Sequence, residues 1–522
     1  MKKHMSKKVV AAITAAATTM SLAACGGSAE PAAQPAAQPE AQAEETQQEA
    51  PAAEETKEEA AEEPAAEEPA AEEEVSPYTV LNDPATGAPY DLGGMEVIVR
   101  DWWSPEDGSV AEPTTQFEED RQAYRDWLQE TYNFTFKYMG GLGWGQGITD
   151  EFQKYATSGG DDQALLFTLP DGFQGPSILQ GLAYDWATID TIDLNDSKYT
   201  KNAVTAYDTI GNKTFGVLAG DPEIGAGLFF NHRILEECGI DPNSIYDLVE
   251  NGGWTWDAFE NMLKTVAAVD KDGDGQSDYF AFGANGIGQT ITVAALGNGG
   301  DIIGKDENGH FVARNEDSAT LEAIEFAYRI TKDYYMTWHD PAVWDDYRTN
   351  YTDGKIAFLI DDGYAGQAGS FVGSCADENG FVPFPTKDGK NLISTVHGNI
   401  IMMPGCYAPE KARLIAFAYD AWETLPAGYE DYNSRASEFN NYNLDEKGIQ
   451  TNFDLQDISK IRPTYAGWVP ELEVSSPLDG ATWSNVYFSM FDGTATVSEI
   501  NDKVRDKWAG ILESTNTALD GI

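Results

Sequence analysis

Two hydrophobic periods alternate along the first part of the body of this chain. Apolar residues at every second position in 95–100 and 134–138, and the apolar run at 165–167, predict strands. Between them, helical spacing of apolar residues predicts helices around 117–132 and 149–156. Strand, helix, strand, helix, strand in this order favours parallel βαβ construction and an α/β fold.

The same kind of pattern continues to the end of the chain. An apolar run at 227–230 leads into Asn231 and a short helix, and Thr255 is a good N-cap for a helix whose apolar face includes Phe259 and Leu263. Several strands stop at polar or aromatic residues, as ligand loops of open α/β sheets do. The remaining expected elements are a helix at 319–335, a strand at 354–360, a helix from Pro409 and a last helix that includes 497–511.

The first 25 residues have the pattern of an export signal. Lysines precede an apolar and small-residue run from Val9 to Leu22, and the run ends in Leu22-Ala23-Ala24-Cys25. These four residues resemble the lipobox of bacterial lipoproteins, in which Cys25 becomes the mature N-terminus and carries acyl chains such as palmitate. We therefore expect residues 1–24 to be a signal peptide and Cys25 to be lipidated; the alternative is an ordinary cleaved signal.

A low-complexity segment follows the cysteine. Residues 26–77 consist mainly of Ala, Glu, Pro and Gln, with no large apolar residue before Val75. Such a segment cannot bury enough surface to fold, and about 50 flexible residues span roughly 40 Å. Residues 25–77 are thus expected to form a lipid-anchored, disordered acidic spacer, and residues 78–522 the folded body.

The charge is strongly negative, at −54 for 522 residues, with 87 acidic and 33 basic side chains. Long-range repulsion then opposes binding to nucleic acid or to anionic lipid surfaces. The membrane is expected to be reached through the lipid anchor only. Three cysteines besides Cys25, at 238, 375 and 406, are too few and too widely spaced for a disulfide framework or a CxxC metal site, which favours free thiols.

The sharpest local motif is an acidic loop at 270–278. Its oxygen-bearing residues match the spacing at which a calcium loop begins, although the twelfth position is Ala281 rather than glutamate. A turn rich in aspartate and glycine is the structural alternative. No cofactor is expected to be required, and a structural calcium is the one metal hypothesis, with candidate ligands Asp270, Asp272, Asp274, Gln276 and Asp278.

Several motifs, taken in order, resemble the family 1 extracellular solute-binding proteins, the sugar-binding components of ABC importers. The lipobox is the first of them. The others are the apolar run ending in Asn231 with its helix to Gly239, Thr255-Trp256-Asp257-Ala258-Phe259, the acidic loop at 270–278, Asp353-Gly354-Lys355-Ile356-Ala357-Phe358, Val382-Pro383-Phe384-Pro385, Gly398-Asn399 and Pro409-Glu410-Lys411-Ala412.

The resemblance implies a two-lobed, periplasmic-binding-protein-like fold of type II, with hinged lobes and a chain that crosses between them more than once. Crossovers are expected near 217–228, 394–400 and 460–470. The N-terminal lobe would combine residues of about 94–220 and 396–460, and the C-terminal lobe residues of about 228–394 and 461–522.

Sugar recognition calls for flat aromatic faces and for carboxylates or amides that bind hydroxyls. Such residues beyond strand ends are the ligand-binding candidates, although a tryptophan packed in a core has the same sequence pattern. The candidates are Trp102, Trp103, Trp144, Asp171, Asp221, Asp361, Asp362, Tyr364, His397, Asn399 and Trp483.

The sequence therefore predicts a non-enzymatic lipoprotein on the extracytoplasmic face of the cell membrane. We expect it to be a monomer that captures a carbohydrate, such as an oligosaccharide, and delivers it to the membrane permeases of an ABC transporter. The alternatives are a cell-surface glycan-active enzyme and a glycan sensor or adhesin. The chain has no GxSxG, HExxH or phosphate-binding loop motif that would favour an enzyme.

Overall fold

The computed structural model describes residues 77–522, apart from 338–342, 344, 431, 433–441, 473, 476–480 and 492. The signal peptide, Cys25 and nearly all of the acidic spacer lie outside the described residues. In the part that is described, no helix is both long and apolar enough to cross a membrane. The three described cysteines are free thiols, as expected.

One lobe is built on a four-stranded sheet in the order β14-β3-β1-β2, with β14 antiparallel to three parallel strands. Successive side chains point to opposite faces, so Val97 and Val99 pack toward helices α2 and α13, whereas Ile98 packs toward α3 and α4. The expected βαβ order is confirmed. The elements are β1 (Met95–Arg100), α2 (Gln116–Tyr132), β2 (Phe134–Met139), α3 (Gln146–Thr157), β3 (Ala164–Pro170), α4 (Gly175–Leu179), η1 (Trp186–Thr188), α5 (Ser197–Thr200), α6 (Val204–Tyr207), β4 (Thr209–Ile210), β5 (Lys213–Thr214), β14 (Asn399–Met402) and α13 (Pro409–Glu423).

The second lobe has its own mixed sheet, in the order β12-β7-β11-β8. Its strands are almost wholly buried, and Thr255 caps the helix that covers one face by accepting a hydrogen bond from the backbone N–H of Ala258, as expected. The elements are β7 (Ala226–Asn231), α7 (His232–Glu237), α8 (Asn243–Glu250), α9 (Trp256–Ala267), β8 (Phe280–Gly283), α10 (Gly286–Gly297), β9 (Ile303–Lys305), β10 (Phe311–Ala313), α11 (Ser318–Tyr334), α12 (Asp346–Thr352), β11 (Ile356–Asp362), η2 (Gly363–Gly366), β12 (Asn379–Val382) and α15 (Glu446–Leu455).

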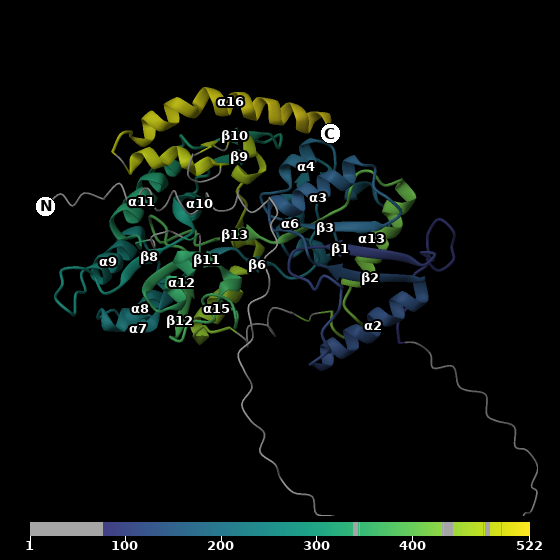
Figure 1. Ribbon diagram of the computed structural model, residues 1–522, viewed down its shortest axis with the longest axis horizontal. Coiled ribbons are helices and arrows are strands. Elements are labelled where there is room, and N and C mark those ends of the chain that lie inside the picture. Colours follow the sequence, from purple (N-terminus) through teal and green to yellow (C-terminus); the bar gives the residue numbers. More distant parts are fainter. Residues whose placement is uncertain are drawn as a thin grey trace, which may run out of the picture.

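A three-stranded sheet joins the two lobes. It consists of β6 (Glu223–Ile224), β13 (Ser394–His397) and β15 (Ile461–Arg462) in the order β15-β13-β6. β6 and β13 carry the chain from one lobe to the other, within the first two crossover regions that the sequence indicated, and Figure 1 shows them between the lobes.

The third crossover differs from the expectation. The sequence assigned 396–460 to the N-terminal lobe, but α15 packs against β12 of the second lobe, and the Asp445 backbone N–H donates to the Asn379 carbonyl at 2.8 Å. The chain therefore changes lobes between α13 and α15, earlier than 460–470. No hydrophobic period marks such a change, because both lobes bury helices in the same way.

The C-terminal segment ties the lobes together along one side. It contains η4 (Ile458–Lys460), η5 (Ala466–Trp468), η6 (Pro470–Leu472), β16 (Val474–Ser475), β17 (Ala481–Thr482), η7 (Trp483–Met490) and α16 (Val497–Gly521). Figure 1 shows α16 lying across the top of both lobes. Asn501 and Asn315 exchange amide hydrogen bonds at its start, and Lys213 of the first lobe donates to the carbonyl of Ile522 at its end.

Trp508 tests how much this strap contributes to stability. Its side chain is fully buried in the hydrophobic cluster that joins residues of both lobes. Trp508→Ala should lower the free energy of unfolding by about 3–5 kcal/mol, the usual cost of removing a buried tryptophan. Denaturant titration followed by circular dichroism measures this. The neighbouring exposed variant, Lys507→Ala, should change it by less than about 0.5 kcal/mol; equal losses would contradict the packing argument.

Candidate binding site

The loop after β1 is held in place by a buried carboxylate. Asp101 accepts hydrogen bonds from the backbone N–H groups of Trp103 (3.1 Å) and Ser104 (2.8 Å) and from the Ser104 hydroxyl (2.6 Å). Trp103 is thereby left 52% exposed, with Trp102 edge-on beside it at 4.7 Å between ring centroids. An aspartate that caps its own turn in this way presents a tryptophan ring at the carboxyl edge of the sheet.

A pocket of about 430 Å³ opens at this edge of the first lobe. It lies between the sheet, the end of α13, helix α5, the start of α2 and the crossover segment that leads to β6. Its polar lining includes the Thr168 hydroxyl and the Asn399 amide. Its aromatic lining residues are Trp103, Phe117, Tyr138, Tyr419 and Tyr432, of which Phe117 and Tyr432 stack at 3.8 Å.

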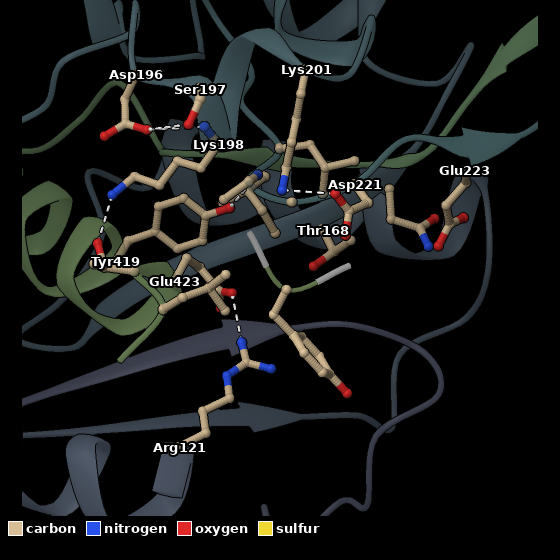
Figure 2. A pocket seen from close by; sticks show the side chains of 18 of the residues that line it. Arg121, Thr168, Asp196, Ser197, Lys198, Lys201, Asp221, Glu223, Tyr419 and Glu423 are labelled. Carbon is tan, nitrogen blue, oxygen red and sulfur yellow. Dashed lines mark hydrogen bonds and ion pairs between the residues drawn. The ribbon is translucent and has the colours of Figure 1, made fainter. Parts of the chain in front are cut away.

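The cations of this pocket are paired with carboxylates. Arg121 lies 3.2 Å from Glu423 and Lys201 lies 2.7 Å from Asp221, as Figure 2 shows. Lys198 lies 2.9 Å from Asp420. Each of the three cations that line the described pocket thus has its charge balanced by the protein itself.

A second polar group, which we call the hinge cluster, lies where the lobes meet. It consists of Asp171, Glu223, Asp362, Tyr364 and His397. Nε2 of His397 is 3.4 Å from Glu223 and Nδ1 is 3.8 Å from Asp362, and the Tyr364 ring stacks on the imidazole at 6.0 Å. Asp171 keeps part of its surface exposed, yet burial raises its pKa to about 6, against an opposing effect of His397 and with a further upward contribution from Asp362.

An ion pair inside the second lobe positions Tyr364. Arg348 of α12 holds both oxygens of Asp361 at 2.8 Å and donates to the Tyr364 hydroxyl at 3.1 Å. The guanidinium also lies 4.3 Å from the centre of the Phe371 ring. Burial raises the pKa of Asp361 even with Arg348 beside it. Asp361, which the sequence analysis offered as a ligand contact, is 1% exposed and serves to fix Arg348.

The structure brings most, but not all, of the sequence candidates together. Trp103, Asp221 and Asn399 line the pocket. Asp171, Asp362, Tyr364 and His397 form the hinge cluster with Glu223, which also lines the pocket. Of the others, Trp102 supports Trp103, Trp144 is 60% exposed and edge-on to Phe173, and Trp483 packs beside Tyr487 in η7.

The sequence analysis missed the helical side of the pocket. Arg121, Lys198, Lys201 and Glu423 come from α2, from α5 and the turn that follows it, and from the end of α13, where a charged residue has the pattern of any solvent-facing helix position. Arg348 was missed for the same reason. The scarcity of bases in so acidic a chain was the available signal, because a base held among acids is more often positioned by them.

The acidic loop between α9 and β8 brings three carboxylates together. One oxygen each from Asp270, Asp272 and Asp274 lies within 4.8 Å of the others. Asp270 accepts hydrogen bonds from the backbone N–H groups of Gly273 and Gly275. Gln276 instead donates to Asp274, and Asp278 accepts from the backbone of Lys271. The first three residues fit a hard cation that prefers oxygen, such as calcium.

Comparison with known proteins places the fold. No known protein family and no curated protein matches the sequence. Among solved structures, the GacH receptor of Streptomyces glaucescens GLA.O, studied unliganded and with acarbose, is 13% identical with a TM-score of 0.53, covering 80% of this chain and 99% of that one. UgpB of Mycobacterium tuberculosis with glycerophosphocholine is 15% identical, TM-score 0.53, covering 81% and 98%.

A third similar structure is the cyclic α-maltosyl-1,6-maltose binding protein of Arthrobacter globiformis. It is 15% identical with a TM-score of 0.51, covering 82% of this chain and all of that chain. The chain therefore has the two-lobed α/β fold of solute-binding proteins, which confirms the fold class expected from the sequence.

The Arg348–Asp361 pair provides a test of the site's internal support. Arg348→Leu leaves a buried carboxylate without its partner and should lower the free energy of unfolding at pH 8 by about 3–5 kcal/mol. Without Arg348 the folded pKa of Asp361 lies still further above its unfolded value, so the penalty is full above that pKa and falls as pH drops through it. Urea titrations at pH 8 and pH 5 should thus show the smaller deficit at pH 5.

Two further variants complete the comparison. The double variant Arg348→Leu with Asp361→Asn should recover stability at pH 8, because the unpaired charge is gone. Lys355→Ala, which breaks the half-exposed pair of Lys355 with Asp353, should change stability little at either pH. A pH-independent deficit in Arg348→Leu would contradict the assignment of the loss to Asp361.

Proposed function

We propose that this protein is an extracytoplasmic receptor that captures a neutral carbohydrate at the junction of its lobes and delivers it to the membrane permeases of an ABC importer. The observation that carries the proposal is the pocket whose aromatic rings surround polar groups with balanced charges. The fold supports it, because similarly folded proteins have been solved with acarbose and with glycerophosphocholine.

The aromatic lining suits a sugar. The rings of Trp103 and Tyr432 offer flat apolar surface for the C–H faces of a pyranose at a low cost in side-chain entropy. Asn399, Thr168 and the carboxylates around them offer acceptors and donors for hydroxyl groups. A hydroxyl-rich ligand satisfies such groups, whereas an apolar ligand would leave them unpaired at about 1–3 kcal/mol each.

The ion pairs favour a neutral ligand over a phosphate ester. A phosphate group would have to draw Arg121, Lys198 or Lys201 away from Glu423, Asp420 or Asp221, leaving carboxylates uncompensated beside it. The acidic surface adds long-range repulsion. We therefore infer that the ligand differs in charge from glycerophosphocholine and belongs with uncharged mono- or oligosaccharides.

The N-terminal sequence gives the receptor its location. Lipidation of Cys25 would hold the protein, as a monomer, on the extracytoplasmic face of the cell membrane, and the spacer would let the body reach a permease while it stays tethered. Two acyl chains anchor a protein stably, whereas one does so only marginally.

One observation favours a second candidate, a glycan-cleaving enzyme. Asp171 has a pKa near 6 and lies close enough to Asp362 for the two charges to interact, as the carboxyl groups of a glycosidase do. Incubating purified protein with a glycan panel separates the two functions. A receptor binds without releasing product, and released sugar would establish the enzyme.

Binding should depend on charge and on Trp103. Thermal shift and titration calorimetry with neutral saccharides and their phosphorylated counterparts should show binding only by neutral forms. Trp103→Ala should weaken the binding of a ligand found in this way about tenfold, the loss expected for one ring contact. Trp144→Ala, at an exposed tryptophan outside the described pocket, is the matched control. Preferential binding of sugar phosphates would sink the neutral-ligand proposal.

We also propose that the acidic loop binds a structural calcium ion. Calcium at 100 times its Kd should stabilise the fold by about 2.7 kcal/mol and raise the melting temperature, and a chelator should reverse this. Asp272→Asn should abolish the calcium response, whereas Asp388→Asn, at another exposed acidic turn, should preserve it. A wild-type melting temperature that calcium and chelator leave unchanged would overturn the proposal.

A further inference from the structure

The two strands that link the lobes carry the most unusual electrostatic arrangement in the described chain. His397 ends the crossover strand β13 and Glu223 begins the crossover strand β6, opposite it in the sheet register. Asp171 follows β3 of the first lobe, and Asp362 ends β11 of the second. The histidine thus lies between one carboxylate from each lobe and one from the hinge itself.

The neighbouring charges are committed elsewhere. Arg348, behind Tyr364, holds Asp361 through two hydrogen bonds, and Lys201 pairs with Asp221 on the first-lobe side. On the β15 side, Arg462 donates to the carbonyls of Ser459 and Ile461. Asp208 lies beyond Asp171, where its hydrogen bond from Gln174 holds it inside the first lobe.

We propose that His397 is a proton-operated latch, whose protonated imidazolium holds Asp171 of one lobe and Asp362 of the other together and so favours closure. When the ring is neutral, three carboxylates face one another across the junction and favour separation of the lobes. As a statement about regulated capture, this rests on the proposed function, but the closure itself needs no ligand.

The direction of the pH effect follows from linkage. If closure brings carboxylates nearer to His397, the closed form holds its proton more tightly, and lower pH then favours the closed form. Asp171 acts in the same direction, because its protonation below about pH 6 removes one of the repelling charges. Between pH 6.5 and 8.5 Asp171 is mostly ionised, so this window isolates the histidine.

The test measures lobe separation in the full-length protein without ligand. Spin labels on unnatural amino acids at two exposed positions, Val110 of the first lobe and Ala368 of the second, allow electron–electron distance measurements at pH 6.5 and 8.5. The closed-to-open ratio should be about tenfold higher at pH 6.5, the change that corresponds to one unit of pKa difference between the two forms.

Three variants decide the origin of such a response. His397→Gln should abolish it, and Asp362→Asn should weaken it if His397→Gln fails to fold. His232→Gln is the matched control, because His232 also lies between two carboxylates, Asp445 at 2.8 Å and Glu378 at 3.5 Å, but all three belong to one lobe. It should keep the wild-type response.

The proposal is overturned if the wild-type distances do not change with pH, if His397→Gln responds as the wild type does, or if His232→Gln also loses the response. Failure of every saccharide to bind would instead overturn the proposed function. The two results are distinguishable, because the distances are measured with no ligand present.

Discussion

The geometry of the site depends on the hydrogen-bonded sheet made by the crossover strands. β13 pairs with β6 on one side and β15 on the other. This pairing fixes His397 beside Glu223, and both sit between lobes whose own sheets are separate. Gly225 allows the close approach, since a Cβ there would lie 2.1 Å from the hydroxyl oxygen of Thr395. A short sheet of this kind is satisfied in its own hydrogen bonds and can therefore hold polar side chains at a junction that must also bend.

Balanced charge is the second constraint, and it acts against the composition of the whole chain. A protein with a formal charge of −54 repels anions at long range. Inside the pocket, however, its few bases are each held against an acid. The result is a polar surface with low net charge, rich in hydrogen-bonding groups and edged by aromatic rings. Such a surface discriminates between ligands by hydroxyl pattern rather than by charge, which is the basis of the proposed specificity.

Much of the fold could be predicted from sequence, because hydrophobic period and capping are local. The βαβ start, the cap at Thr255 and the strand that ends in Asp361 and Asp362 all follow from neighbouring residues. The lobe change before α15 and the helical wall of the pocket could not be predicted in this way. Arg121 and Glu423 are 302 positions apart, and only tertiary packing brings them to 3.2 Å.

Asp361 and Asp362 show where the limit of local reasoning lies. Both follow the same apolar strand, and the sequence gave no reason to separate them. In the structure, successive side chains of β11 point to opposite sides. Asp361 therefore turns into the lobe and is neutralised by Arg348, whereas Asp362 faces His397 at the junction. One residue supports the site and its neighbour belongs to it, and the difference arises from where α12 places a single arginine. A pair of acids at a strand end thus predicts the location of a site, while the partner that arrives from elsewhere in the chain decides which acid can act there.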